Sequence, residues 1–149
     1  MKGFGNNNKS TKKPIRKGYE TLDRDKLISN ALSLHSSGKI KEALGVYNFL
    51  IKNKFYDPRV LNNLGSIYFQ LKQFDKAILI FEESIKKFPN SFESYTNLAN
   101  ALVNTGRSEI AKKILIRAIE LNPNYLLPYS NLAGIYVGEG DFEKAELFL

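Results

Sequence analysis

Cysteine is absent from the 149-residue sequence, and histidine and methionine occur once each. Without cysteine the chain can form no disulfide framework, no thiolate metal site and no thiol nucleophile, which agrees with a reducing compartment such as the cytoplasm. Long apolar runs are absent as well, because no stretch approaches the ~20 apolar residues of a membrane span. No apolar run of signal-peptide length follows the basic amino terminus. We therefore expect a cytoplasmic protein that is neither secreted nor inserted in a membrane.

Side chains suited to catalysis are sparse too. The single histidine, His35, has no second metal ligand or nucleophile at a recognisable spacing. The carboxylates of the sequence are spread along the polar faces of predicted helices, where charges normally solvate a helix. We therefore expect no enzyme activity, no cofactor and no metal site within these residues.

What the sequence does contain is one pattern that returns every 34 residues. A constant period in this range indicates stacked copies of one small unit rather than a single closed core. Such a stack presents an extended surface, so binding is the function that the pattern favours. The repeated residues are the alanines Ala43, Ala77, Ala111 and Ala145, the glycines Gly38, Gly106 and Gly140, and the Asn-Leu pairs that begin at Asn63, Asn97 and Asn131.

Each unit reads as a pair of helices. The apolar residues stand three and four positions apart, which predicts an α-helix with one buried stripe. After the Asn63 segment comes a turn, and then a second such run that includes Phe74 and Phe81. The dipeptide Asp57-Pro58 places a capping acid before a proline that fits the first turn of a helix. The sequence therefore predicts two helices in each repeat, joined by a turn.

At these positions the chain resembles the tetratricopeptide repeat (TPR) family. The family's 34-residue signature has Leu-Gly or Leu-Ala, an aromatic residue, an alanine, a second aromatic residue and a proline. The first unit is a degenerate copy, with Asn30 and Phe55 where the pattern has leucine and proline. The resemblance implies an all-α fold, an α-solenoid of antiparallel helix pairs with about 3.5 to 4 repeats. The second unit matches the signature at Leu64, Gly65, Tyr68, Ala77, Phe81 and Pro89.

We divide the chain into a basic segment at residues 1–21 and a TPR array at residues 22–149. Six lysine and arginine residues against one glutamate place +5 of the net charge of +7 within the first twenty residues. The basic segment has too few apolar residues to offset the entropy of ordering, so we expect it to be disordered. It could touch nucleic acid or anionic lipid through counterion release, although a solvated leader is the simpler interpretation. The repeats are expected at about 24–57, 58–91, 92–125 and 126–149, the last of them incomplete.

Asn63, Asn97 and Asn131 occupy the same phase of three successive first helices. In TPR proteins the first helices line the concave surface, so the resemblance places these amides in a ladder along a groove. An asparagine offers an acceptor and two donors, which match the C=O and N–H of a peptide unit. The pattern resembles the asparagine ladder in the TPR arm of O-linked N-acetylglucosamine transferases. An equally weighted alternative is that the amides satisfy backbone groups between neighbouring helices.

The neighbouring groove positions are mostly polar and uncharged, so the sequence does not favour a charged ligand. The form of the family that clamps a terminal carboxylate would need basic residues where this chain has Asn62 and Glu93. We therefore expect a neutral stretch of protein or peptide as the ligand. The candidate ligand-binding residues are Asn63, Asn97, Asn131, Asn62, Ser66, Asn100, Gln70 and Asn104.

The sequence ends at Leu147, Phe148 and Leu149, partway through the second helix of the fourth repeat and without a polar capping helix. A solenoid needs a terminal element with a polar outer face, so we expect either a further segment or self-association through this end. The leader resembles those of larger bacterial TPR proteins in which the repeats precede a catalytic domain.

Two functions from different classes follow. The first is a protein–protein interaction module that binds an extended peptide or a partner domain in the concave TPR groove. The alternative is a substrate-presenting TPR arm of a larger enzyme, of glycosyltransferase, sulfotransferase, methyltransferase or oxygenase type, whose catalytic domain is absent from these residues. A nucleic-acid or membrane tether through the basic segment is a weaker third interpretation.

Overall fold

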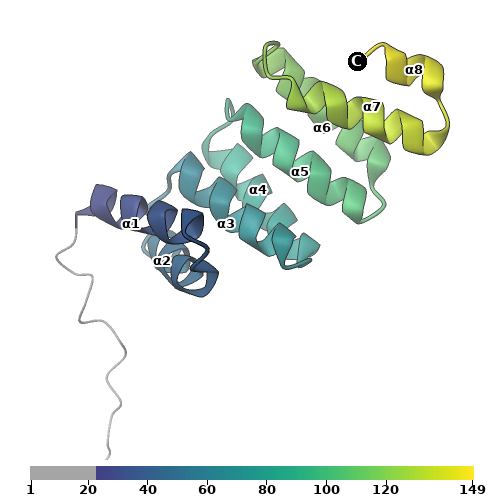
Figure 1. Ribbon diagram of the computed structural model, residues 1–149. Helices are drawn as coiled ribbons and strands as arrows, with labels where there is room; N and C mark the ends of the chain where they lie inside the picture. The colour runs from purple at the N-terminus through teal and green to yellow at the C-terminus, as the bar shows by residue number, and fades with distance from the viewer. Residues whose placement is uncertain (1–22) are drawn as a thin grey trace, which may run out of the picture.

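The computed structural model describes residues 23–149, and all regular structure within this range is helical (Figure 1). The basic segment at residues 1–21 lies outside the described residues, so its expected disorder stays a prediction. The helices of the described range are α1 (Arg24–Ser36), α2 (Ile40–Lys52), α3 (Pro58–Gln70), α4 (Phe74–Lys87), α5 (Phe92–Asn104), α6 (Ser108–Leu121), α7 (Leu127–Glu139) and α8 (Phe142–Glu146).

The helices stack in pairs along one row. Consecutive helices pack against each other, and successive first helices also touch, α1 against α3, α3 against α5 and α5 against α7. In Figure 1 the row runs from the purple α1 to the yellow α8, with α3, α5 and α7 in front of α4 and α6. The expected all-α solenoid of antiparallel helix pairs is confirmed.

The start of α3 shows how the sequence sets a helix boundary. Asp57 is extended, and its carboxylate accepts a hydrogen bond from the backbone N–H of Arg59 at 2.9 Å. Pro58 follows as the first helical residue, where its missing N–H leaves no intrahelical bond unmade. The Asp57-Pro58 pair therefore begins α3, with the capping acid and the first-turn proline that the sequence predicts.

The core runs between the first and second helices of the row. One apolar cluster joins α1, α2 and α3 and includes Leu27, Tyr47 and Leu64, all buried. A second cluster joins α4, α5, α6 and α7 and includes Phe81 and Leu115. Burying a leucine or phenylalanine side chain contributes roughly 1.5–3 kcal/mol, so packing inside each helix pair and packing against the neighbouring repeat both stabilise the array. The four repeated alanines are all buried, namely Ala43, Ala77, Ala111 and Ala145.

The turns inside the helix pairs share one backbone conformation. Gly38, Gly106 and Gly140 adopt φ of 76°, 77° and 78°, in the left-handed region. Lys72 occupies the same repeat position between α3 and α4 and adopts φ of 56°. In this region the Cβ of an L-residue crowds the following carbonyl oxygen, whereas glycine has no Cβ. The second repeat therefore makes the same turn with a strained lysine.

Replacing Lys72 with glycine is expected to stabilise the chain by about 1 kcal/mol, because relief of a left-handed penalty of ~1–2 kcal/mol exceeds the entropic cost of glycine. Urea unfolding followed by circular dichroism measures this change. Gly106→Ala at the equivalent position is the matched control, and it should destabilise the chain. A Lys72→Gly variant no more stable than the original chain would contradict the strain assignment.

Candidate functional site

Two hollows lie on the face that the first helices form. The α3–α5 pocket has a volume of about 290 Å³ and is lined by Ser66, Phe69, Gln70, Phe81, Asn97 and Asn100. The α5–α7 pocket also has a volume of about 290 Å³ and is lined by Phe69, Asn100, Val103, Asn104, Ser130, Asn131, Gly134 and Ile135. Because both pockets contain Phe69 and Asn100, they are neighbours, and we call them together the groove.

The groove contains six of the eight candidate residues and no charged side chain. Its polar groups are amides and hydroxyls, and its apolar groups include Phe69, Val103 and Ile135. A neutral polar lining of this kind can hydrogen-bond a peptide backbone while the apolar side chains cover part of it. The structure thus brings Asn97, Asn131, Ser66, Asn100, Gln70 and Asn104 together, whereas Asn62 and Asn63 lie outside the groove.

Asn131 joins two repeats. Its Nδ2 donates to Oδ1 of Asn100 at 2.8 Å, and Asn104 Nδ2 donates to the backbone carbonyl of Asn100 at 2.9 Å. The bond between Asn131 and Asn100 connects α7 to α5 and satisfies one polar atom of each half-buried amide. Within residues 23–149 no hydrogen bond occupies the side-chain oxygen of Asn131 or the side-chain amino group of Asn100. Asn131 therefore has a structural role and can also meet a ligand.

Asn97 differs from the other members of the ladder. Among residues 23–149 its side-chain amide makes no hydrogen bond, although it is half-buried in the lining of the α3–α5 pocket. A partly buried amide without a protein partner must be satisfied by water or by a ligand. Asn97 is thus the ladder residue whose side-chain N–H groups and C=O group are both free to bind a ligand.

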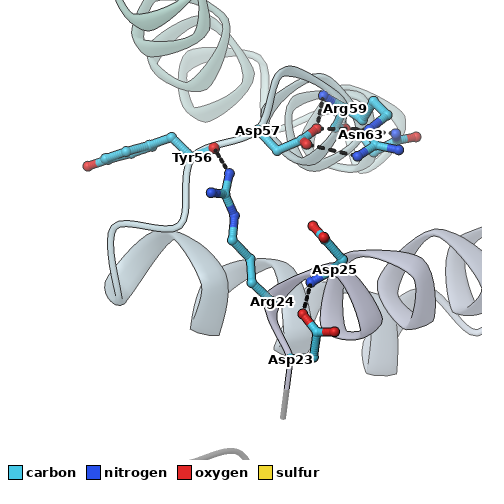
Figure 2. A network of polar contacts seen from close by, with 7 residues as sticks. All are labelled: Asp23, Arg24, Asp25, Tyr56, Asp57, Arg59 and Asn63. Atoms are coloured by element: carbon cyan, nitrogen blue, oxygen red, sulfur yellow. Dashed lines mark hydrogen bonds and ion pairs between the residues drawn. The ribbon is translucent and has the colours of Figure 1, made fainter.

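Asn63 bonds within its own helix, as Figure 2 shows. Its Nδ2 donates to the backbone carbonyl of Arg59 at 2.8 Å. The Arg59 side chain folds back onto Asp57, with Nε to Oδ1 at 3.0 Å and Nη2 to Oδ2 at 2.9 Å. Hydrogen bonding from the Arg59 side chain holds the pKa of Asp57 below its usual value. Arg24 of α1 reaches the same corner and donates to the Tyr56 carbonyl at 2.6 Å.

Asn62 and Asn63 line a third and larger hollow, which we call the corner pocket. It has a volume of about 630 Å³ and lies between the first turns of α3 and the connection from α4 to α5. Unlike the groove it contains charged residues. The corner pocket is lined by Pro58, Arg59, Asn62, Asn63, Lys87, Phe88, Pro89, Asn90, Ser91 and Glu93.

A hydroxyl network holds Asn62 in the wall of the corner pocket. Asn62 Oδ1 accepts from Ser94 Oγ at 2.9 Å, and its Nδ2 donates to Ser91 Oγ at 3.4 Å. The Ser94 oxygen also lies 2.8 Å from the oxygens of Ser84 and Ser91. The network is anchored in the core, because Ser84 and Ser94 are both fully buried. Asn62 therefore fastens α3 to Ser94 of α5 through its oxygen and to Ser91, just before α5, through its nitrogen.

Neither Ser84 nor Ser94 is among the residues predicted from the sequence, although the sequence contains a signal for both. Ser94 stands at the repeat position of Val60, and Ser84 stands at the repeat position of Leu50. Val60 and Leu50 are buried, so a serine at each of these two phases in a later repeat indicates a buried polar contact, since buried hydroxyls require partners.

Other classes of site find no support in the described part of the chain. No cluster of three or more histidine, cysteine, aspartate or glutamate residues within 23–149 has the arrangement of a metal site. None of the helices in that range is both long and apolar enough to cross a membrane.

The fold and the groove define a class of protein, the α-helical solenoid built from repeated helix pairs. The family described as "Psidin, N-terminal TPR repeats region" matches residues 9–122. The chain therefore belongs to the tetratricopeptide repeat family, as its 34-residue period indicates. This fold supports a general role as a protein–protein interaction scaffold.

Curated relatives are similar to parts of the chain. The peroxisomal targeting signal receptor of Saccharomyces cerevisiae is 32% identical over 93 residues, 62% of this chain and 15% of its own length. The BBSome complex member BBS4 of Bos taurus is 31% identical over 121 residues, 81% of this chain and 23% of its own length. The chain thus spans less than a quarter of the length of these relatives.

A third relative is an enzyme by name. The probable UDP-N-acetylglucosamine–peptide N-acetylglucosaminyltransferase SEC of Arabidopsis thaliana is 33% identical over 97 residues, 65% of this chain and 10% of its own length.

Solved structures share the fold. MamA from Desulfovibrio magneticus RS-1 has a TM-score of 0.75 at 19% identity, covering 85% of this chain and 71% of that one. The thermophilic TPR protein TTC0263 of Thermus thermophilus has a TM-score of 0.72 at 21% identity, again covering 85% and 71%. At these identities the likeness shows the fold alone.

Proposed function

We propose that the chain binds an extended peptide, or an extended part of a partner domain, in the groove along α3, α5 and α7. The observation that carries this proposal is the unpaired amide of Asn97 in an uncharged groove that continues across two repeat junctions. A peptide backbone offers the N–H and C=O groups that such an amide lacks. The names of two relatives, a targeting signal receptor and a complex member, agree with a protein as the partner.

The geometry of the groove suits an extended ligand better than a compact one. Each pocket is small, at about 290 Å³, but the two are joined at Phe69 and Asn100. An extended peptide rises about 3.3 Å per residue, so a short segment can place neighbouring groups in both pockets. Phe69, Val103 and Ile135 would cover one apolar side chain, and the amides would hold the backbone on either side.

Filling the groove tests this function. A Cβ added at Gly134 of α7 meets nothing within 4 Å, so Gly134→Tyr should place a ring in the α5–α7 pocket without disturbing the core. Peptides selected by the full chain from a random dodecapeptide display library should bind this variant about tenfold more weakly or worse. Fluorescence anisotropy with the labelled peptides measures the affinities.

Gly45→Tyr is the matched control, because Gly45 lies in the second helix α2 and also has open space around an added Cβ. This variant should keep the original affinity. Equal weakening by both substitutions, or by neither, would contradict binding in the groove.

The similarity to the SEC transferase favours one second candidate, a substrate-presenting arm of a larger enzyme. The peptide would then occupy the same groove and be handed to a catalytic domain outside these residues. Immunoblotting of the natural protein with an antibody against residues 23–149 separates the two. A mass near that of 149 residues supports the free binding module, and a much larger product that carries transferase activity supports the arm. The cytoplasmic location and the tether role of residues 1–21 stay predictions.

The last repeat supports a further proposal, that the chain self-associates. Leu126 before α7 and Leu147 and Leu149 after α8 are 73%, 78% and 91% exposed, and they share a hollow of about 300 Å³ with Phe148. Apolar side chains that gather in one exposed patch favour contact with another surface.

Sedimentation velocity of the full chain should therefore show association that increases with concentration. A Leu147→Lys/Leu149→Lys variant should shift the chain to monomer, because two charges would have to be buried in the contact. Leu79→Lys is the matched control, since Leu79 of α4 is 65% exposed but lies in another repeat. Monomer at all concentrations in the original chain would contradict the proposal.

A further inference from the structure

The corner pocket has charges that the groove lacks. At about 630 Å³ it is the larger hollow, and Arg59, Lys87 and Glu93 lie in its wall beside neutral amides and hydroxyls. A ligand that enters it meets a different chemistry from one confined to the groove.

The corner pocket and the groove lie one after the other on the same pair of helices. Asn63 lines the corner pocket and Ser66, three residues later in α3, lines the α3–α5 pocket. Glu93 and Asn97, four residues apart in α5, stand in the same relation. Residues three or four apart share one face of a helix, about one turn or 5.4 Å along its axis. A peptide in the groove can therefore extend into the corner pocket by about two residues.

Both cations of the corner pocket are already paired. Arg59 makes a two-pronged contact with the Asp57 carboxylate at 2.9 and 3.0 Å. Lys87 Nζ lies 3.7 Å from Glu83 Oε1 and 4.4 Å from the centre of the Tyr56 ring. An anionic ligand would have to compete with these intramolecular carboxylates for either cation.

Glu93 is the charge that has no ionic partner. No basic side chain within residues 23–149 forms an ion pair with it, and its one side-chain hydrogen bond comes from Ser91 Oγ at 3.3 Å. It lies in the first turn of α5, where the helix dipole stabilises a negative charge. Its field also reaches Tyr125, because burial and then the Glu93 charge raise the pKa of that phenol.

The wall around Glu93 is fixed before any ligand arrives. Ser91, which donates to Glu93, is itself held by Asn62 and Ser94 through the hydroxyl network that begins at buried Ser84. Glu93 itself is exposed, and its hydrogen bond from Ser91 restricts the rotamers of the carboxylate, which lowers the entropy that pairing with a ligand costs. Phe88 and Pro89 of the same wall offer apolar surface to the aliphatic stem of a long cationic side chain.

We infer that the corner pocket binds a lysine or arginine side chain of the peptide that occupies the groove, with Glu93 as its ionic partner. This inference rests on the proposed function and adds a specificity to it. The preferred peptide would have a basic residue at one end of a neutral or apolar segment. That end of the peptide would lie at the junction of α3 and α5. Among residues 23–149 the lining of the groove has no charged side chain, and Glu93 lies beside its α3–α5 end, so the same contact sets the direction of the peptide.

The test selects peptides from a random dodecapeptide display library on three forms of the full chain, the original, Glu93→Gln and Glu82→Gln. Glu82 is an exposed carboxylate of α4 outside all of the described pockets, so Glu82→Gln removes the same charge without touching the corner pocket. The original chain and Glu82→Gln should select peptides with lysine or arginine at one fixed position. Glu93→Gln should select neutral segments without that position.

A double-mutant cycle makes the assignment specific. In the best selected peptide, replacing the basic residue with glutamine should weaken binding to the original chain about two- to fivefold, the range for one ion pair at an exposed site. The same replacement should change binding to Glu93→Gln less than about twofold. A charge-reversed pair, Glu93→Lys with glutamate in the peptide, should recover affinity.

The possible results distinguish the Glu93 contact from peptide binding in the groove. Peptides that bind in the groove but show no basic position would overturn the inference alone. So would a basic residue whose replacement costs the same affinity in Glu93→Gln as in the original chain. Failure to select any peptide that Gly134→Tyr weakens would overturn the proposed function and this inference together.

Discussion

Changing Asn63, Asn97 and Asn131 together to alanine is expected to weaken binding of a selected peptide by about one to two orders of magnitude. Each hydrogen bond to a ligand contributes only ~0.5–1.5 kcal/mol net, because water competes for the same groups, and the two terms from Asn97 and Asn131, which line the groove, roughly add. Isothermal titration calorimetry with one peptide against the single and triple variants measures the loss. Thermal melting of each variant is followed in parallel.

The structure predicts unequal single effects. Asn97→Ala should lose the most affinity with little change in melting temperature, since the Asn97 amide makes no hydrogen bond within residues 23–149. Asn131→Ala should lower the melting temperature as well, because it breaks the bond to Asn100. Asn63→Ala should have the smallest effect on binding to the groove, since this residue lines the corner pocket. Unchanged affinity of the triple variant alongside a lowered melting temperature would show that the ladder is only structural.

Gly65→Ala is expected to destabilise the fold by about 1–3 kcal/mol, the usual result of overpacking a core. Gly65 lies in α3, and a Cβ built on it would stand 2.4 Å from a ring carbon of Phe81 in α4. Phe81 is 1% exposed and lines the α3–α5 pocket, so its ring can move only toward that hollow and away from its packed position. The added methyl group therefore displaces the Phe81 ring from the core or pushes the two helices of the second repeat apart. Urea unfolding followed by circular dichroism measures the loss.

A second substitution should rescue the first. The third repeat has Ala99 and Leu115 at the positions of Gly65 and Phe81, and both are fully buried. Gly65→Ala combined with Phe81→Leu copies this pair and should be more stable than the sum of the single effects by about 1 kcal/mol or more. Phe81→Leu alone should cost stability, because it leaves a cavity beside Gly65. Strict additivity of the two changes would contradict direct packing between the two residues.

Most of the fold is predictable from the sequence because it depends on local and periodic signals. The 34-residue period and the apolar spacing give the helix pairs, and Asp57-Pro58 gives the start of α3. The left-handed conformation of Lys72 is not predictable from local signals. The turn keeps its left-handed residue even where the sequence has no glycine, since packing of α3 against α4 fixes the backbone whatever residue stands there.

The candidate groove is predictable only in outline. The three ladder asparagines share a phase, yet each has a different environment, because the partner of each depends on the residue 31 positions earlier. Asn131 meets Asn100, whose amide can accept its bond, whereas Asn97 lies with Ser66 in one pocket and makes no bond to it. A repeat pattern fixes where a side chain stands but not what the neighbouring repeat offers it.

The corner pocket could not be predicted from the sequence. Its wall combines α3, the connection from α4 to α5 and the start of α5, and the sequence does not show how these segments meet. The unpaired state of Glu93 depends on where Arg59 and Lys87 find their own carboxylates, which only the folded chain determines.

The central claim is that a ligand lies in the groove formed by α3, α5 and α7. Nuclear magnetic resonance of the asparagine side-chain amides, recorded on the ¹⁵N-labelled full chain during titration with a selected peptide, tests it most directly. The account predicts large shifts for Asn97, Asn100 and Asn131 and none for Asn48 and Asn53, which lie at the surface of the first repeat in or beside α2. Shifts at Asn48 and Asn53 without shifts at Asn97 and Asn100 would contradict it.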